Sequence, residues 1–242
     1  MGSIDPLQTS PVHLPRKAQT REEHGNFMSI DEVLEVIHAN RIIAIVRLDD
    51  LSSAVDLTRA LLAGGIRALE FTLSNPEAIE AMAKVKAAVP EFDRGEAVIG
   101  IGTVLNAAQA QAAICAGAQF IVSPTTSFTT IEMCNQMKTA VMPGAFTPTE
   151  ILTAWEAGAS AVKVFSARSV GPRYVKDVRE PLPFLRLIPT GGVEQANIGD
   201  YLKNGAFAVG VGGNLIDKQL VAARDWVALT DRARTFVEAA QV

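Results

Sequence analysis

The chain has 242 residues, of which 48% are hydrophobic and 20% charged, and its formal net charge is −4. A chain of this length fits one large domain or two small ones and buries enough surface to fold without disulfides or a structural metal. The acidic balance argues against nucleic-acid binding, and no apolar run is long enough to predict a membrane span or a secretory signal. Two cysteines without CxxC spacing, Cys115 and Cys134, are typical of reduced, buried thiols in a cytoplasmic protein.

Residues 1–26 differ from the rest of the chain, because they combine prolines and mixed polar residues with no apolar periodicity. We expect this segment to be a disordered tail. The remaining residues, 27–242, are expected to form one folded domain. Its first element is predicted to be a helix over 31–40, where apolar residues recur on one stripe.

Eight short apolar runs follow this helix and alternate with Ala-rich amphipathic segments of helix length. The runs lie at 41–47, 67–73, 97–104, 119–124, 140–145, 161–165, 186–192 and 207–213. The first and last runs are as apolar as the middle ones, so neither is typical of an exposed edge strand. No GxGxxG motif follows the first run, which argues against a dinucleotide-binding sheet. We therefore predict an α/β fold, a single (β/α)₈ TIM barrel over 27–242 with an extra N-terminal helix.

One lysine stands inside a predicted strand. Lys163 is flanked by Val162 and Val164, and strand alternation points the two valines outward to the helices and the lysine into the barrel. Burying an ammonium costs free energy unless it is paired, so desolvation favours the neutral amine, which can attack a ketone to form a Schiff base. The alternative is a lysine in a structural ion pair.

Glu70 is the only carboxylate inside any of the eight predicted strands. Alternation places Leu69 and Phe71 on the outer face and Thr72 on the same inner face as Glu70. An inward glutamate with an inward lysine suggests an acid/base group beside an amine nucleophile. A buried Lys–Glu salt bridge of purely structural value is the alternative.

Further candidates lie where strands end. Arg47 closes the first strand, where a guanidinium suits a carboxylate or phosphate, although an arginine turned to solvent is the alternative. Thr103 ends the third strand and can offer a hydroxyl to a ligand oxygen. The last two strands end in the pairs Gly191-Gly192 and Gly212-Gly213, where barrel enzymes commonly hold a phosphate on backbone N–H groups, and ordinary left-handed turns are the alternative there.

A metal site is not expected. The histidines are His13, His24 and His38, and none of them ends a predicted strand. With one inward carboxylate and no histidine at a strand end, the ligands that zinc or magnesium prefers are not brought together. No GxSxG or Walker A motif is present either. Metal-free chemistry through Lys163 remains.

These candidates occur within a longer series of motifs. In chain order, the motifs are IIAIVR, GGIRALEFTL, GIGTVLN, FIVSP, MPGAFTPTE, AVKVFSA, GPRYVK, PTGGV and AVGVGG. The series resembles the 2-keto-3-deoxy-6-phosphogluconate (KDPG) and 4-hydroxy-2-oxoglutarate (KHG) aldolases, small lysine-dependent barrel enzymes that release pyruvate. The resemblance covers residues 29–242. It implies a class I lyase that needs neither a metal nor an organic cofactor, and commonly a homotrimer.

The resemblance also implies residue roles. Lys163 would be the Schiff-base lysine and Glu70 the general acid/base, while Arg47 and Thr103 would hold the pyruvate carboxylate. Further residues would shape the pocket, namely Thr72, Pro124 and Phe165. Backbone amides would carry the phosphate, at Gly191, Gly192, Gly212 and Gly213.

Three positions depart from the family pattern. Ser74 stands where many members carry an arginine, and because other members instead have a strand-1 arginine like Arg47, carboxylate binding would move there. Ser166 replaces a usual proline, and Asn214 replaces a serine that often follows the strand-8 glycines. Because the GPRYVK stretch also resembles the phosphogalactonate branch, the sugar stereochemistry stays open. A sugar-phosphate isomerase or epimerase and a non-catalytic binding module are the more distant alternatives.

Overall fold

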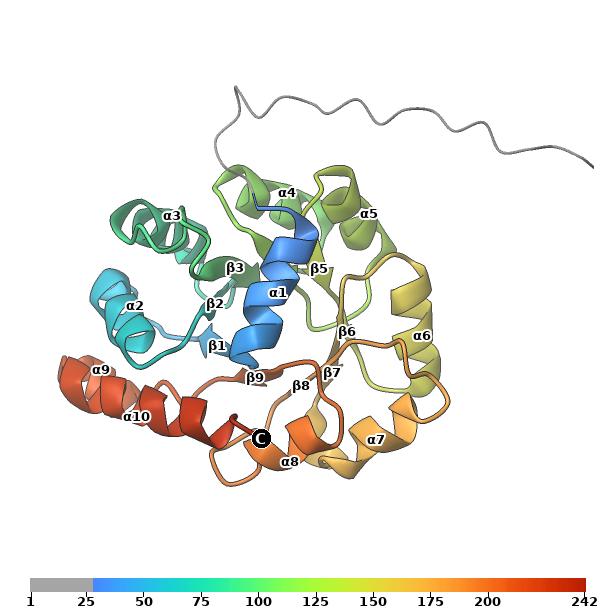
Figure 1. Ribbon diagram of the computed structural model, residues 1–242. Helices are drawn as coiled ribbons and strands as arrows, with labels where there is room; N and C mark the ends of the chain where they lie inside the picture. Colours follow the sequence, from blue (N-terminus) through green and yellow to red (C-terminus); the bar gives the residue numbers. More distant parts are fainter. Residues whose placement is uncertain (1–27) are drawn as a thin grey trace, which may run out of the picture.

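A ring of parallel strands forms the centre of the protein, and helices surround it (Figure 1). The computed structural model describes residues 28–242, so the predicted tail at 1–26 lies outside the described residues. The strands are β1 (Ile42–Val46), β2 (Ala68–Thr72), β3 (Val98–Gly102), β4 (Phe120–Val122), β5 (Ala140–Met142), β6 (Gly144–Ala145), β7 (Val162–Phe165), β8 (Leu187–Thr190) and β9 (Val209–Val211). Each of them lies within one of the eight predicted runs.

The strands close into a barrel with eight strand positions. Their order is β5-β4-β3-β2-β1-β9-β8-β7-β6, and every pair is parallel. β5 and β6 are two halves of the run predicted as one strand at 140–145, and they are separated by Pro143, which has no backbone N–H to donate to a ladder. The Pro143 carbonyl still accepts a hydrogen bond from the Lys163 amide at 2.9 Å, so the ring continues through this break. The predicted TIM barrel is confirmed.

The helices occupy the segments between the strands, as the alternating pattern predicts. They are α1 (Ile30–Asn40), α2 (Ala54–Ala63), α3 (Ala78–Ala88), α4 (Ala107–Cys115), α5 (Phe128–Gln136), α6 (Pro148–Glu156), α7 (Arg173–Arg179), α8 (Ile198–Lys203), α9 (Lys218–Ala222) and α10 (Trp226–Ala239), with a short 3₁₀ helix, η1 (Ala167–Ser169). Glycines follow four of the helices with left-handed backbone angles, as expected for helix stops. Their φ values are 95° at Gly65, 102° at Gly117, 98° at Gly158 and 94° at Gly205.

Helix α1 closes one end of the barrel. It begins with a capping box between Ser29 and Glu32, and its buried face is formed by Val33, Leu34 and Ile37. This face packs against residues at the first positions of the strands, including Ala68 and Val98 in the same apolar cluster. In Figure 1 the helix crosses the ring of strands. Because α1 covers the N-terminal ends of the strands, the opposite, C-terminal end is the one left for a ligand.

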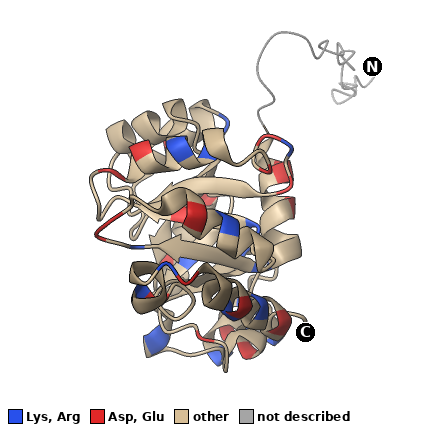
Figure 2. Ribbon diagram, turned by 90° about the vertical axis from the view of Figure 1, so that its left-hand side faces the viewer, with Lys and Arg blue, Asp and Glu red and all other residues tan. Residues whose placement is uncertain are grey.

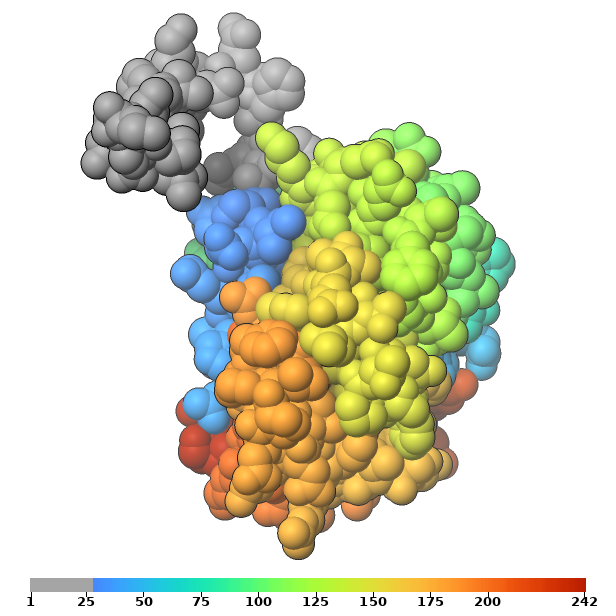
Figure 3. All heavy atoms as spheres, turned by 90° about the vertical axis from the view of Figure 1, so that its right-hand side faces the viewer, coloured from blue at the N-terminus to red at the C-terminus, as the bar shows by residue number. Residues whose placement is uncertain are grey.

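The outer layer packs the other face of the strands against the helices. Leu69, Phe71, Val162 and Val164 belong to this larger apolar cluster together with helix residues such as Leu61. The helical layer closes on itself where α10 packs on α2, and Figure 3 shows α5, α6 and α7 following one another along one side. The ribbon in Figure 2 shows that Lys and Arg positions alternate with Asp and Glu positions along the chain, without a segment of one sign.

Two further expectations concern the cysteines and the membrane. Cys134 is buried, as predicted, whereas Cys115 is exposed because it lies at the solvent side of the end of α4, so its predicted burial is wrong. Burial raises the pKa of the Cys134 thiol to about 12. Within residues 28–242, no helix combines the length and the apolar character needed to cross a bilayer.

Candidate active site

Lys163 points into the barrel, as alternation predicts. Its side chain is buried at 4% exposure, whereas its neighbours Val162 and Val164 belong to the outer apolar cluster. In the ladders Lys163 lies opposite Gly144 on one side and Ile188 on the other. Its Nζ lies 5.3 Å from the centre of the Phe165 ring, which shares its face of β7. The amine is therefore held in an apolar setting near the C-terminal end of the strands.

Glu70 is the second buried ionisable side chain of the barrel interior, at 2% exposure. Among the described residues, its Oε1 has no hydrogen-bond partner. A β-carbon on Gly102 of the neighbouring strand would collide with this carboxyl group, so a glycine at that position makes the room in which Glu70 lies. An unpaired, buried carboxyl is costly for stability, which makes it a candidate for chemistry.

The electrostatic setting of Glu70 involves two cations. Burial raises the pKa of Glu70 above its usual range, and the nearby positive charges of Lys163 and Arg47 lower it by a smaller amount. Nevertheless, no ion pair joins Lys163 to Glu70 in the described part of the chain, where the ion pairs lie on exposed side chains. The buried structural salt bridge, the alternative for these two residues, is therefore not observed.

A cavity of about 270 Å³ opens over Lys163 at the C-terminal end of the barrel. Most of the predicted site residues line it together, namely Arg47, Lys163, Phe165, Gly191, Gly192, Gly212 and Gly213. Its other lining residues are Ile45, Arg168, Thr190, Val193, Gly210 and Asn214. The cavity is thus positively charged at its rim and contains the buried amine at its base.

Backbone geometry requires glycine in one of the two glycine pairs at the rim of the cavity but not in the other. Gly191 and Gly192 have φ values of 91° and 77°, and β-carbons there would lie 2.8 Å from the Ser166 hydroxyl and 2.8 Å from the Arg168 β-carbon, respectively. Turn geometry and close packing therefore explain this pair. Gly212 and Gly213, by contrast, do not have a positive φ. None of the described atoms lies within 4 Å of a β-carbon built on Gly213. The left-handed turn, which was the alternative, does not explain the second pair.

Amide side chains fix the loops that carry these glycines. The Asn214 amide donates to the Val193 carbonyl at 2.9 Å, and the Asn197 amide donates to the Gly192 carbonyl at 3.0 Å. The loops after β8 and β9 are thereby joined across the rim of the cavity. Asn214, a departure from the family pattern, therefore has a structural contact of its own.

Four of the predicted residues do not line the main cavity, and Glu70, buried below it, is one of them. Thr72 is buried, and its hydroxyl donates to the Val46 carbonyl at 3.2 Å and contacts the Ser74 hydroxyl at 2.8 Å. Pro124 lines a neighbouring groove that shares Phe165 with the main cavity. Thr103 lies directly after β3 at a φ of 60°, and it lines neither space.

Arg168 and Thr190 also line the cavity, although they are not among the residues predicted from the sequence. Thr190 ends β8 on the same face as Ile188, so strand alternation was a signal that could have found it. Arg168 lies in η1, a short irregular turn where neither strand nor helix periodicity applies. The sequence held no signal for its position.

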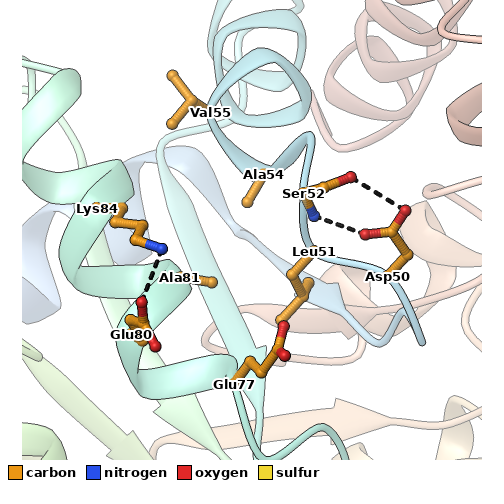
Figure 4. A pocket seen from close by; sticks show the side chains of 9 residues that line it. All are labelled: Asp50, Leu51, Ser52, Ala54, Val55, Glu77, Glu80, Ala81 and Lys84. Atoms are coloured by element: carbon orange, nitrogen blue, oxygen red, sulfur yellow. Dashed lines mark hydrogen bonds and ion pairs between the residues drawn. The ribbon is translucent and has the colours of Figure 1, made fainter.

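A separate cavity of about 330 Å³ lies between the start of α2 and helix α3 (Figure 4). Three of its charged side chains are already engaged, because Asp50 accepts hydrogen bonds from Ser52 and Lys84 pairs with Glu80 at 2.7 Å. None of the predicted site residues lines this space. Elsewhere in residues 28–242, no three His, Cys, Asp or Glu side chains come together as a possible metal site.

Comparisons with known proteins agree on one family. Residues 33–231 match the family model described as KDPG and KHG aldolase. A 2-dehydro-3-deoxy-phosphogluconate aldolase of Treponema pallidum is 34% identical over 199 residues, which cover 82% of this chain and 92% of that protein. A probable 2-dehydro-3-deoxy-6-phosphogalactonate aldolase of Rhizobium meliloti is 35% identical over 175 residues, 72% of this chain and 81% of that protein.

A solved structure extends the similarity to the fold. The KDPG aldolase of Legionella pneumophila, with pyruvate captured as a covalent carbinolamine intermediate, superposes with a TM-score of 0.77 at 27% identity. The match covers 84% of this chain and 97% of that one. The family resemblance inferred from the sequence motifs is confirmed, and the chain belongs to the KDPG and KHG aldolase family.

Proposed function

We propose that this protein, a class I pyruvate aldolase, cleaves a 2-keto-4-hydroxy acid reversibly to pyruvate and an aldehyde through an imine on Lys163. The observation that carries the assignment of Lys163 is its placement, buried in the barrel at the base of a cavity and without an ion-pair partner among the described residues. Such a lysine is held for chemistry rather than for a salt bridge. No cofactor is required.

The reaction begins when the neutral Lys163 amine attacks the C2 ketone to give a carbinolamine. Glu70 relays protons while water leaves, and the iminium that results withdraws electrons from the C3–C4 bond. The Glu70 carboxylate then takes the proton of the C4 hydroxyl, the C3–C4 bond breaks, and the aldehyde leaves. The enamine is protonated at C3, and hydrolysis releases pyruvate and restores the amine.

The remaining predicted residues bind the substrate in this proposal. Arg47 and Thr103 hold the pyruvate carboxylate, at the rim and at the end of β3. The pocket walls are formed by Thr72, Pro124 and Phe165. Backbone amides receive a phosphate, at Gly191, Gly192, Gly212 and Gly213. The open space at Gly213 supports this role. Neither packing nor the backbone angle requires glycine at this position, and the space beside its backbone is open to a ligand.

The aldehyde half is the open part of the proposal. With 2-keto-3-deoxy-6-phosphogluconate the second product is glyceraldehyde 3-phosphate, and with 4-hydroxy-2-oxoglutarate it is glyoxylate. The phosphogalactonate epimer is the alternative, because the Rhizobium meliloti relative at 35% identity carries that name. Comparing kcat/KM for these three substrates identifies the preferred one.

Borohydride reduction in the presence of pyruvate tests the central step. The expected result is a pyruvyl adduct, located by peptide mass mapping on Lys163, because reduction converts the imine into a stable secondary amine. A pyruvyl adduct on another lysine would assign the role of nucleophile to that lysine instead of Lys163. The absence of any adduct would discard the aldolase mechanism and favour an isomerase or a binding module.

We further propose that the protein is a homotrimer. Leu105, Phe128 and Phe146 are 56%, 60% and 38% exposed and follow β3, β4 and β6 at the mouth of the barrel. Phe128 and Phe146 line the same groove, and Leu105 follows β3, the strand next to β4, so the three residues lie along one stretch of the mouth. A second copy of the chain covering this stretch accounts for its exposure.

Replacing Phe128 with aspartate tests the trimer. We expect sedimentation equilibrium to give three times the chain mass of 25.8 kDa for the wild type and a smaller species for Phe128→Asp, because a carboxylate is costly in an apolar interface. Phe184→Asp is the control, since Phe184 is 52% exposed just before β8, at the other end of the barrel. A monomeric wild type, or a trimer that tolerates Phe128→Asp, contradicts the proposal.

A further inference from the structure

Arg168 lies at the rim of the catalytic cavity with its guanidinium free. In residues 28–242, Arg47, Arg168 and Arg224 are the arginines without a hydrogen bond or an ion pair. Two of these three, Arg47 and Arg168, line the cavity that contains Lys163. Other arginines are engaged, as Arg232 is by the Asn214 carbonyl. A guanidinium carries five N–H donors, so both free groups are available to anions.

The two free arginines of the cavity occupy different ends of it. Arg47 comes two residues after Ile45, which lies opposite Glu70 in the ladder of β1 and β2, and its charge acts on Glu70 together with that of Lys163. Arg47 is therefore the cation near the reacting carbons. Arg168 lies against the loop after β8, where a β-carbon on Gly192 would come within 2.8 Å of its own β-carbon. Its side chain leaves the backbone beside the predicted phosphate loop.

The substrates of the proposed reaction carry a negative charge at each end. The C1 carboxylate is adjacent to C2, which Lys163 fixes as an imine, so this end lies near Lys163 and Arg47. The second anion is at the far end of the aldehyde half, as a phosphate ester or as a second carboxylate. A planar guanidinium can bind either group with two parallel hydrogen bonds.

We propose that Arg168 recognises the distal anion of the substrate and so sets a preference for aldehydes that end in a negative charge. This inference rests on the proposed aldol cleavage, and it adds a specificity-determining side chain to the backbone amides of the glycine loops. The exposed position of Arg168 in η1, with its donors unpaired, is consistent with a group that is engaged only when substrate is present.

Cleavage kinetics with three substrates test the role of Arg168. They are 2-keto-3-deoxy-6-phosphogluconate, 4-hydroxy-2-oxoglutarate and the uncharged-ended 2-keto-3-deoxygluconate. For Arg168→Ala we expect kcat/KM to fall by ~10- to 100-fold on the substrates with a distal anion, as for the loss of a charge-assisted hydrogen bond. The uncharged-ended substrate should change by less than about 3-fold, and Arg168→Lys should restore part of the loss.

Arg224→Ala is the matched control, because Arg224 is also free of hydrogen bonds and ion pairs but lines a different surface pocket. A loss on only one of the anionic substrates supports the proposal and identifies the anion as phosphate or carboxylate. Equal losses on all three substrates, or no loss, overturn it. Pyruvate trapping on Lys163 separates the failure of the Arg168 proposal from the failure of the aldol mechanism. If the wild type traps pyruvate and Arg168→Ala affects all three substrates equally, only the role of Arg168 is refuted. A wild type without trapping refutes the aldol mechanism itself.

Discussion

Replacing Lys163 with methionine or alanine is expected to lower aldol cleavage by ~10³-fold or more and to abolish pyruvate trapping by borohydride. The reason is that no imine can form without the amine, so the electron-withdrawing iminium that weakens the C3–C4 bond is lost. Methionine keeps much of the volume and the apolar stem of the buried side chain, which is 4% exposed. Initial rates of pyruvate release, together with mass mapping after reduction, measure both effects.

Lys203→Ala is the control for this substitution, because Lys203 is an exposed lysine on α8, away from the cavity. It should retain wild-type activity and trapping. Circular dichroism should show both Lys163 variants folded, since an uncharged side chain at this position removes the cost of burying an amine. Near-normal turnover in either Lys163 variant would remove the Schiff base from the mechanism.

The alternation of side chains along the strands predicts much of the fold and the two central residues of the site. Because successive side chains of a strand point to opposite faces, the runs around Lys163 and Glu70 were enough to place both groups inside the barrel and their apolar neighbours outside it. Pro143 is a sequence signal for the break between β5 and β6, since proline cannot donate to a ladder, although the run that contains it is otherwise apolar.

Features of the site that lie outside regular strands and helices could not be predicted from the periodicity of apolar residues. Arg168 lies in a turn whose path depends on packing against Gly192, a contact between residues that no local pattern relates. Thr103 ends its strand in the left-handed region, so alternation no longer fixes its direction, and it lines neither the cavity nor the groove beside it. The electrostatic balance at Glu70 likewise depends on three strands that only the closed barrel brings together.

Glu70→Gln is expected to lower cleavage by ~10²- to 10⁴-fold, because an amide of nearly the same shape cannot accept the C4 hydroxyl proton or relay protons during imine formation. Pyruvate trapping on Lys163 should become slower but remain detectable, since the amine is intact. A stopped-flow record of pyruvate release and a time course of trapping separate the two steps. Glu35→Gln, an exposed position on α1 at the closed end of the barrel, is the control.

The same substitution should stabilise the protein at neutral pH. Burial raises the pKa of Glu70 from its ordinary 4.5, so the folded state holds this proton to a higher pH than the unfolded chain does. The contribution of Glu70 to stability is therefore fully present below pH 4.5 and is lost as the pH rises through the folded-state pKa. Glutamine stays neutral, which removes this loss, and each kcal/mol recovered raises Tm by ~2–4 °C.

Thermal unfolding of wild type and Glu70→Gln between pH 4 and pH 8 measures this effect. We expect the two melting curves to converge at the acid end of this range and to separate as the pH rises, with the variant more stable and less active. A variant that is less stable than the wild type at neutral pH would mean that the Glu70 carboxylate is held by favourable charges. Lys163 and Arg47 would then outweigh the desolvation of the carboxyl, and Glu70 would be a structural anion rather than a strained acid/base group.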